Sequence, residues 1–261
     1  MPIWKKCKDP ALTTVKDHGY NVVQLPRVDL IPTQLLYSSN GKLRRLGELE
    51  SVFVPAPDGP PAPPILPDQP GPDIEGTKSN EINVDIGIDI LGGLISALGG
   101  STLGISMAYS RAKSVTFAFS NTKRTETDLA LVDQFLASVS INRYARAARD
   151  MLDSDEVYLV SSVIKSNAIS VAAKTSGDAD LTIDIPVVQG AIGGNLTVEG
   201  NAASAGLVKY TGAVPLAFGF QAIRLIFEDG VYQTFKSVEA GAVSAEAAAP
   251  DLNPDVMLMM D

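Results

Sequence analysis

The stretch from Glu81 to Phe119 most constrains the fold, because it alternates between apolar and polar residues on both sides of an uncharged segment. From Glu81 to Ile90 every second residue is apolar, and the alternation resumes from Gly104 to Phe119 with two basic interruptions. A period of two is typical of a β-strand with one buried face. Ile90–Ser110 holds no charged side chain over 21 residues. Two amphipathic strands with an apolar connection are what a hairpin needs if it must at some stage face lipid.

A membrane-spanning helix is the alternative for Ile90–Ser110, because its length matches the thickness of a bilayer. Its composition disfavours a helix, since ten of the 21 residues are Gly, Ser or Thr. Each glycine inside a helix costs about 1 kcal/mol relative to alanine. The sequence therefore favours a strand hairpin here.

The remaining patterns predict an α+β fold with a mostly antiparallel sheet, because strands come first, a helix follows, and strands return with hairpin turns. A short helix is expected around Pro10–Asp17 and a longer one from Glu126 to about Leu152, with a break near Ile141. Residues 54–73 hold nine prolines and predict an extended polyproline-like loop. The predicted strands are 20–25, 35–37, 50–54, 157–171, 179–187, 195–199, 205–211, 216–227 and 231–235, with a turn at Ser39–Gly41 and hairpin turns at Ser176–Asp178 and Glu228–Gly230.

Residue types that carry enzyme chemistry are scarce. The only histidine, His18, and the only cysteine, Cys7, lie near the N-terminus, where a catalytic pair is difficult to bury and orient. No Cys/His cluster offers zinc ligands. The glycine-rich segment 92–102 lacks the lysine that a phosphate-binding loop requires. Asp85, Asp89, Asp180 and Asp184 lie on the polar faces of predicted strands, as solvated carboxylates do. We therefore expect no enzyme activity, no metal and no dissociable cofactor.

Charge and cysteine content narrow the partners and the compartment. A net charge of −9 argues against nucleic acid as a partner, since phosphate binding needs a basic surface. A single cysteine excludes a disulfide within the chain and indicates a reducing compartment. Met1–Pro32 lacks the apolar core of a signal peptide, so a cytoplasmic location is expected.

The N-terminal segment suggests a lipid attachment site. Cys7 lies among Lys5, Lys6 and Lys8, and a cysteine in a basic, amphipathic setting is a candidate for S-acylation. An unmodified surface thiol is the alternative.

The C-terminal segment suggests regulation by proteolysis. Residues 236–250 are mostly small, which is typical of an exposed and cleavable connector. An apolar cluster follows, and a plug on a cleavable tether indicates autoinhibition. The alternative is a tail that docks for stability alone. The candidate cleavage residues are Lys236, Glu239, Glu246 and Asp251, and the tail cluster consists of Leu252, Val256, Met257, Leu258 and Met259.

Several segments together resemble the gasdermin family, and its bacterial members in particular. Tyr20–Asp29, Leu35–Tyr37 and Leu46–Phe53 resemble the N-terminal region of bacterial gasdermins. Val214–Leu225 is similar to a late core strand of gasdermin pore-forming domains. The resemblance spans nearly the whole chain and implies a gasdermin-like α+β fold, with a twisted, mostly antiparallel central sheet and surrounding helices.

The resemblance also implies a function. Residues 1–236 would be the pore-forming domain, and 237–261 a cleavable linker and autoinhibitory tail. An activating protease would release a monomer, which would oligomerise as a transmembrane β-barrel in the inner membrane and kill the cell, typically as antiphage defence. The alternative is a soluble binding or scaffold protein whose tail only stabilises the fold.

The same resemblance assigns roles to individual residues. It maps the acylated cysteine of the family, and hence a palmitoyl group, onto Cys7, and the two membrane-inserting hairpins onto 81–119 and 157–200. The candidate lipid-facing residues are Ile82, Val84, Ile86, Ile88, Ile90, Ile105, Met107, Val115, Phe117, Ile169, Val171, Leu181, Ile183 and Ile185. The basic candidates for contact with lipid headgroups are Lys5, Lys6, Lys8, Lys42, Arg44 and Arg45.

Overall fold

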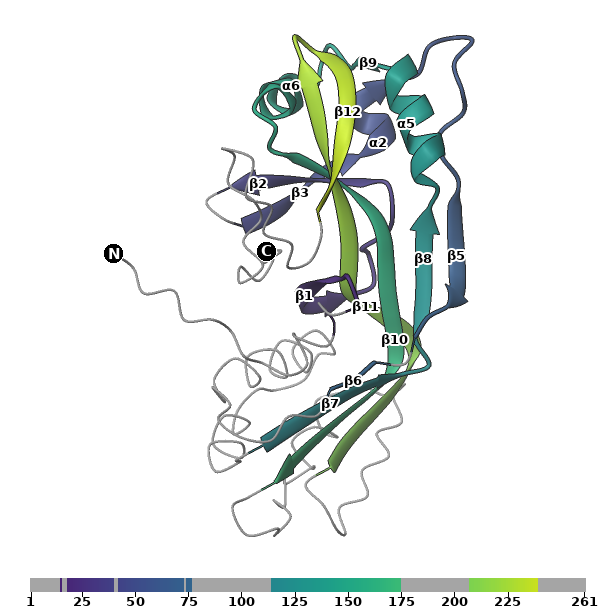
Figure 1. The fold of residues 1–261 in the computed structure, drawn as a ribbon, viewed down its shortest axis with the longest axis vertical. Coiled ribbons are helices and arrows are strands. Elements are labelled where there is room, and N and C mark those ends of the chain that lie inside the picture. The colour runs from purple at the N-terminus through teal and green to yellow at the C-terminus, as the bar shows by residue number, and fades with distance from the viewer. Residues whose placement is uncertain are drawn as a thin grey trace, which may run out of the picture.

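The computed structural model describes residues 15, 18–39, 42–72, 74–76, 114–174 and 207–238. Strands predominate in these ranges, and short helices lie beside one end of the sheet (Figure 1). The strands are β1 (Asn21–Arg27), β2 (Gln34–Ser39), β3 (Lys42–Glu48), β4 (Phe53–Val54), β5 (Ile65–Pro70), β6 (Ile74–Gly76), β7 (Ser114–Ser120), β8 (Lys123–Thr127), β9 (Ser140–Ile141), β10 (Val157–Lys174), β11 (Leu207–Glu228) and β12 (Val231–Val238). The helices are α2 (Leu49–Val52), α5 (Leu129–Ser138) and α6 (Arg146–Asp153).

Two long strands, β10 and β11, form the axis of a ten-stranded sheet. They pair with each other over most of their length, and the strand pairs described in this sheet are all antiparallel. Along its other edge β10 pairs in turn with β2, β8 and β7. The other edge of β11 pairs with β12 and then with β1. One pair of strands therefore runs from the helical end of the molecule to the opposite end.

Apolar side chains cover both faces of the upper half of this sheet. On one face Leu159 and Leu225 pack with Phe135 and Leu136 of α5 and with Leu152 of α6. The neighbouring strand residues point to the other face and form a second cluster, which includes the residues Val23, Leu36, Leu43, Val160, Val163 and Phe220. Alternation along β10 therefore supplies two cores, which explains why Val157–Ile164 is buried without interruption.

The predicted α+β class and the antiparallel sheet are confirmed, as are the strands expected at 20–25, 35–37, 157–171, 216–227 and 231–235. The separate strands expected at 205–211 and 216–227 are parts of the single strand β11. The turn predicted at Ser39–Gly41 lies only partly within the described residues. The strands predicted at 179–187 and 195–199 lie outside them.

Three predictions were wrong in detail. Residues 50–54 were expected to be a strand, but Leu49–Val52 is helical and only two residues of β4 follow. The helix expected from Glu126 begins at Leu129, because the strand β8 continues to Thr127. The proline-rich stretch is not a loop throughout, since Ile65–Pro70 pairs with β8. Proline is tolerated there because β5 is an edge strand.

Candidate functional site: a four-stranded ladder and its junction with the core

Strands β6, β7 and β10 and the first part of β11 form a four-stranded antiparallel ladder at the end of the sheet away from the helices (Figure 1). One row of Cα partners across it consists of Gly76, Phe117, Val171 and Val208. At this end β6 and β10 finish, and β7 and β11 start. Segment 77–113 therefore connects β6 to β7, and segment 175–206 connects β10 to β11, at the same end of the ladder.

The ladder contains those predicted lipid-facing residues that the structure describes. Val115 and Phe117 lie in β7, Ile169 and Val171 lie in β10, and Phe117 is the register partner of Val171. The structure thus places the bases of the two predicted hairpins on neighbouring strands. The other ten, Ile82, Val84, Ile86, Ile88, Ile90, Ile105, Met107, Leu181, Ile183 and Ile185, lie outside the described residues, and their role stays a prediction.

The ladder joins the core at one level, where the two outer pairs of strands end and the pairing of β10 with β11 becomes irregular. Strand β5 ends at Pro70, before β6 begins. Strands β7 and β8 are separated by a short turn that contains Asn121, which has a φ of 53°. The register of β10 against β11 shifts between Ser166 and Ala168. Figure 1 shows the strands changing direction at this level. We call this level the junction.

The largest irregularity at the junction is a bulge in β11. Ser166 pairs with Leu216, but Ala168 pairs with Thr211, so β11 contains three more residues than β10 between these pairs. The extra residues lie in 212–215, which begin with glycine and end with proline. Both residues are found where strands bulge or bend. Opposite the bulge, the amide oxygen of Asn167 is buried and has no hydrogen-bond partner in the described structure. The backbone here is less regularly paired than elsewhere in β10.

On the β5 side of the sheet, close contacts at the junction join the segment after β5 to the turn between β7 and β8. The backbone N–H of Gly71 donates to the carbonyl oxygen of Thr122 at 3.0 Å. The Thr122 hydroxyl donates to the carbonyl oxygen of Pro72. A Cβ atom on Gly71 would lie 2.8 Å from the Thr122 Oγ1 and 3.1 Å from its carbonyl carbon. Only glycine allows this approach without a shift.

An aromatic pair links the ladder to the core across the junction. Phe119 of β7 and Phe218 of β11 are both buried, and their rings stack with centroids 4.0 Å apart. Phe218 is an extra residue of β11, because Ile164 pairs with Gly219 while Lys165 pairs with Ala217. The second, smaller bulge thus leaves Phe218 without a register partner in β10.

The β11–β12 hairpin is fastened to the helices at its turn. The Tyr232 hydroxyl donates to the Asp133 carboxylate of α5 at 2.6 Å, and the Gly230 N–H donates to Asp153 of α6 at 3.2 Å. Burial, with the hydrogen bond to Asp133 and its charge, raises the pKa of Tyr232 above its usual range. The predicted cleavage residue Lys236 is an exposed part of β12, opposite Arg224.

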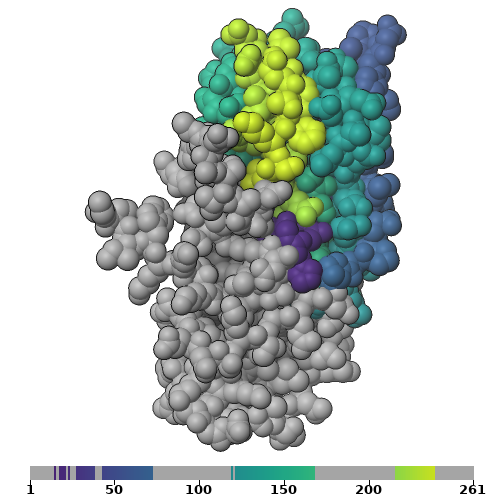
Figure 2. Space-filling model, viewed as in Figure 1, coloured from purple at the N-terminus to yellow at the C-terminus, as the bar shows by residue number. Residues whose placement is uncertain are grey.

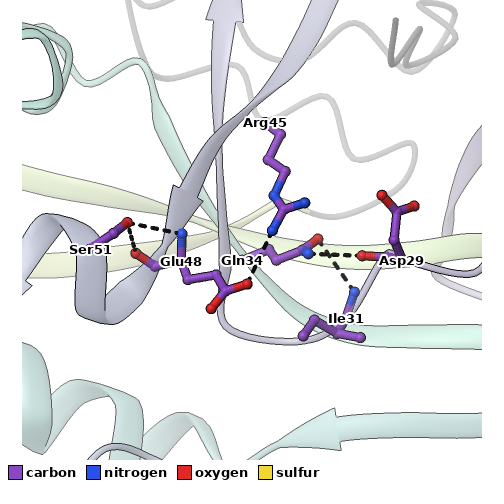
Figure 3. A network of polar contacts seen from close by, with 6 residues as sticks. All are labelled: Asp29, Ile31, Gln34, Arg45, Glu48 and Ser51. Atoms are coloured by element: carbon purple, nitrogen blue, oxygen red, sulfur yellow. Dashed lines mark hydrogen bonds and ion pairs between the residues drawn. The ribbon is translucent and has the colours of Figure 1, made fainter.

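The predicted headgroup residues Arg44 and Arg45 are exposed on β3. The guanidinium of Arg45 lies 3.1 Å from the Glu48 carboxylate, and Figure 3 shows the two side chains paired. The same view shows Gln34, which is buried and donates to the Asp29 carbonyl oxygen at 2.8 Å, fastening the turn between β1 and β2. Arg45 is therefore held close to a carboxylate. Lys42 lies at the start of β3.

The remaining predicted residues lie outside the described residues: Lys5, Lys6, Cys7, Lys8, Glu239, Glu246, Asp251, Leu252, Val256, Met257, Leu258 and Met259. In the described part of the chain, no three His, Cys, Asp or Glu side chains gather as a metal site. No helix in the described ranges is long and apolar enough to cross a membrane.

The sequence patterns did not reveal the junction. Glycine and proline at 212 and 215, inside an otherwise strand-like run, are the signal that could have located the bulge in β11. The Gly71–Pro72 pair is the corresponding signal on the opposite edge. The stacking of Phe119 on Phe218 has no local signal, because the two residues lie 99 positions apart in the chain.

Comparisons with known proteins agree with this architecture. A sequence profile of the Bacterial Gasdermin Family matches residues 23–231. Gasdermin bGSDM of Lysobacter enzymogenes is 54% identical over 96% of this chain and 93% of its own length. Gasdermin bGSDM of a Desulfuromonadales bacterium is 36% identical over 92% of this chain and 90% of its own length. The solved structure of a bacterial gasdermin from Bradyrhizobium tropiciagri has a TM-score of 0.57 at 16% identity, covering 88% of this chain and 92% of that one.

The ladder, the antiparallel sheet and these relatives define a pore-forming protein rather than an enzyme. The scaffold alternative is therefore not retained. The chain belongs to the bacterial gasdermin family.

Proposed function

We propose that this chain is an autoinhibited pore former that is activated by proteolytic cleavage within its C-terminal tail, residues 237–261. The released domain, monomeric and cytoplasmic at rest, oligomerises into a transmembrane β-barrel in the inner membrane. The resulting leak kills the cell, as a defence against phage. One observation carries the proposal: both amphipathic segments, 77–113 and 175–206, connect neighbouring strands at one end of a single ladder.

The direction of the ladder strands supports closure into a ring. Every adjacent pair is antiparallel, so the outer strands β6 and β11 run in opposite directions. Among the described residues β6 pairs only with β7, and residues 207–211 of β11 pair only with β10. Copies placed side by side would join β6 to the next β11 in antiparallel order. Lipid cannot satisfy free backbone groups, so closure must accompany insertion.

The exit point of the tail supports autoinhibition. The last residue of β12, Val238, lies opposite Ala222, and the first residue of β1, Asn21, lies opposite Phe220. The chain thus leaves for its C-terminal segment on the β11 side of the sheet, above the ladder edge that would receive the next copy. A C-terminal segment attached at this point would sterically oppose assembly until a protease removes it.

Cleavage of a defined bond in liposome leakage assays tests the proposal. Because Lys236 belongs to a paired strand, the engineered protease site belongs after Val238, within 239–250. We expect dye release after cutting and none without protease, and the wild-type chain with the same protease is the control for non-specific cutting. Complete cutting with intact vesicles would overturn the proposal.

Lipid attachment at Cys7 is a separate part of the proposal, supported by the neighbouring Lys5, Lys6 and Lys8. The intact mass of protein recovered from native membranes should show a fatty-acyl increment that the Cys7→Ser variant lacks. An unmodified mass would remove this role. The role of Lys42, Arg44 and Arg45 in headgroup contact is tested separately, by comparing binding of the cleaved protein to vesicles with and without anionic lipid.

A further inference from the structure

The core sheet directly above the junction has one strand more than the ladder below it. Its order is β5, β8, β10, β11 and β1. One row of Cα partners across it consists of Gln69, Arg124, Ile164, Gly219 and Val22. In the described part of the chain β5 pairs only with β8, and β1 only with β11. Figure 1 shows β5 and β1 on opposite sides of the two long strands.

The odd strand number changes how the outer strands can meet. All neighbours in this layer are antiparallel, so its outer strands β5 and β1 run in the same direction. The outer strands of the ladder run in opposite directions. If copies join through their ladders, β5 of one copy comes to face β1 of the next in a parallel orientation.

Strand β5 is unsuited to pairing with a further strand. Pro67 and Pro70 have no N–H group, and Asp68 has a φ of 52°. Its register against β8 shifts between Leu66 and Gln69. Proline and irregular backbone on an edge strand prevent the addition of another strand. All six residues of β5 are nevertheless exposed, including Ile65 and Leu66. Figure 2 shows the chain segment that contains β5, in blue, along one margin of the molecule.

The row that contains Leu66 shows what a second copy would present. Leu66 is level with Glu126, Ser162 and Gln221. Gln221 lies between Ala222, opposite the end of β12, and Phe220, opposite the start of β1. Leu66 of one copy would therefore face the gap between β12 and β1 of the next. Val238, the last described residue, lies at that same place.

We propose that β5 is a contact surface for a second copy of this chain. It packs through side chains against β1 and the end of β12 of the neighbour, while its prolines leave β6 as the edge that adds strands. The inference rests on the proposed function. It adds that assembly needs the exposed face of β5 as well as the free edge of β6.

Cross-linking tests the contact directly. The test protein carries two cysteines in a Cys7→Ser background. Gln69→Cys lies on β5, and Val28→Cys lies just after β1, at a residue that is 57% exposed. Within one copy these edges are separated by four strand spacings, about 19 Å. After tail cleavage on liposomes, a short bismaleimide should give a series of multimers on a denaturing gel. Each single-cysteine variant should give none, and so should the uncleaved protein. Leakage without multimers would overturn the contact.

A charge placed on β5 gives a second, independent measurement. Leu66→Glu puts a carboxylate on a side chain that is 45% exposed and that becomes covered on assembly. We expect leakage per cleaved molecule to fall about tenfold, with unchanged thermal stability before cleavage. The matched control is Val231→Glu at the far β11–β12 turn, 60% exposed, which should leak normally. Wild-type leakage from Leu66→Glu would overturn the inference, whereas failure of the cleaved wild type to leak would overturn the proposed function itself.

Discussion

The ring of Phe119 stacks on the ring of Phe218 with planes 6° from parallel and centroids 4.0 Å apart. Phe119 belongs to the ladder and Phe218 to the core above the junction. Their contact spans the level at which β11 carries three additional residues and at which the buried amide oxygen of Asn167 has no hydrogen-bond partner among the described residues. The pair therefore compensates with apolar contact for irregular pairing of the backbone.

Removing this pair should destabilise the fold. Phe119→Ala and Phe218→Ala each delete a buried aromatic ring, which costs about 3 kcal/mol or more. Urea unfolding followed by circular dichroism measures the loss. In a double-mutant cycle with leucine at both positions, we expect a coupling energy of about 1 kcal/mol from stacking. Strictly additive losses would show that the two rings stabilise the fold independently.

A methyl group on Gly71 should also be costly. The Cβ atom of alanine would lie 2.8 Å from the Thr122 Oγ1 and 3.2 Å from the Thr122 carbonyl oxygen, so backbone must move. Gly71→Ala should lower the free energy of unfolding by about 1–3 kcal/mol. The control is Gln69→Ala on the neighbouring exposed strand, which should change stability by less than about 0.5 kcal/mol. Equal stability of the two variants would show that the junction yields easily.

The sequence predicts the long strands well, because their patterns are strong and their faces are buried. Strand-forming apolar runs predicted both 157–171 and 216–227, and the turn at Glu228–Gly230 separates β11 from β12. The bulge at 212–215 could not be derived from this pattern, since glycine and proline there read equally well as a loop. That interpretation split β11 in two.

Tertiary context decided the other failures. The helix was predicted to start at Glu126, which is too early, because Thr125 and Thr127 are buried in β8 beside β10. Ile65–Pro70 is proline-rich and exposed, so local propensity cannot reveal that β8 pairs with it. For the functional site, the sequence predicts apolar positions in two hairpins. The shared ladder edge follows only from the pairing of β7 with β10 over residues 114–120.

The true helix start can be tested at Asp128. Its side chain accepts a hydrogen bond from the Ala130 N–H at 2.8 Å and caps α5. Asp128→Ala should cost about 1 kcal/mol, while Asp128→Asn should retain most of the stability. Thermal unfolding compares the two variants. Unchanged stability of Asp128→Ala would show that Asp128 does not cap the helix.

The last prediction concerns alkaline pH and the Tyr232–Asp133 hydrogen bond. At neutral pH, Tyr232→Phe removes a partly exposed hydrogen bond to a carboxylate, which should cost about 1 kcal/mol. In the native protein, burial and Asp133 raise the pKa of Tyr232 above its usual range. In the unfolded chain this hydroxyl ionises near pH 10, as tyrosine ordinarily does.

The sign of the pH effect follows from proton binding. Below about pH 10 both states hold the proton, so the stabilising contribution of Tyr232 is fully present. As the pH rises further, the unfolded state releases this proton while the native state keeps it, so stability falls with pH. We expect the urea midpoint of the wild type to fall more steeply above about pH 10 than that of Tyr232→Phe. Parallel declines would show that other groups govern the alkaline loss.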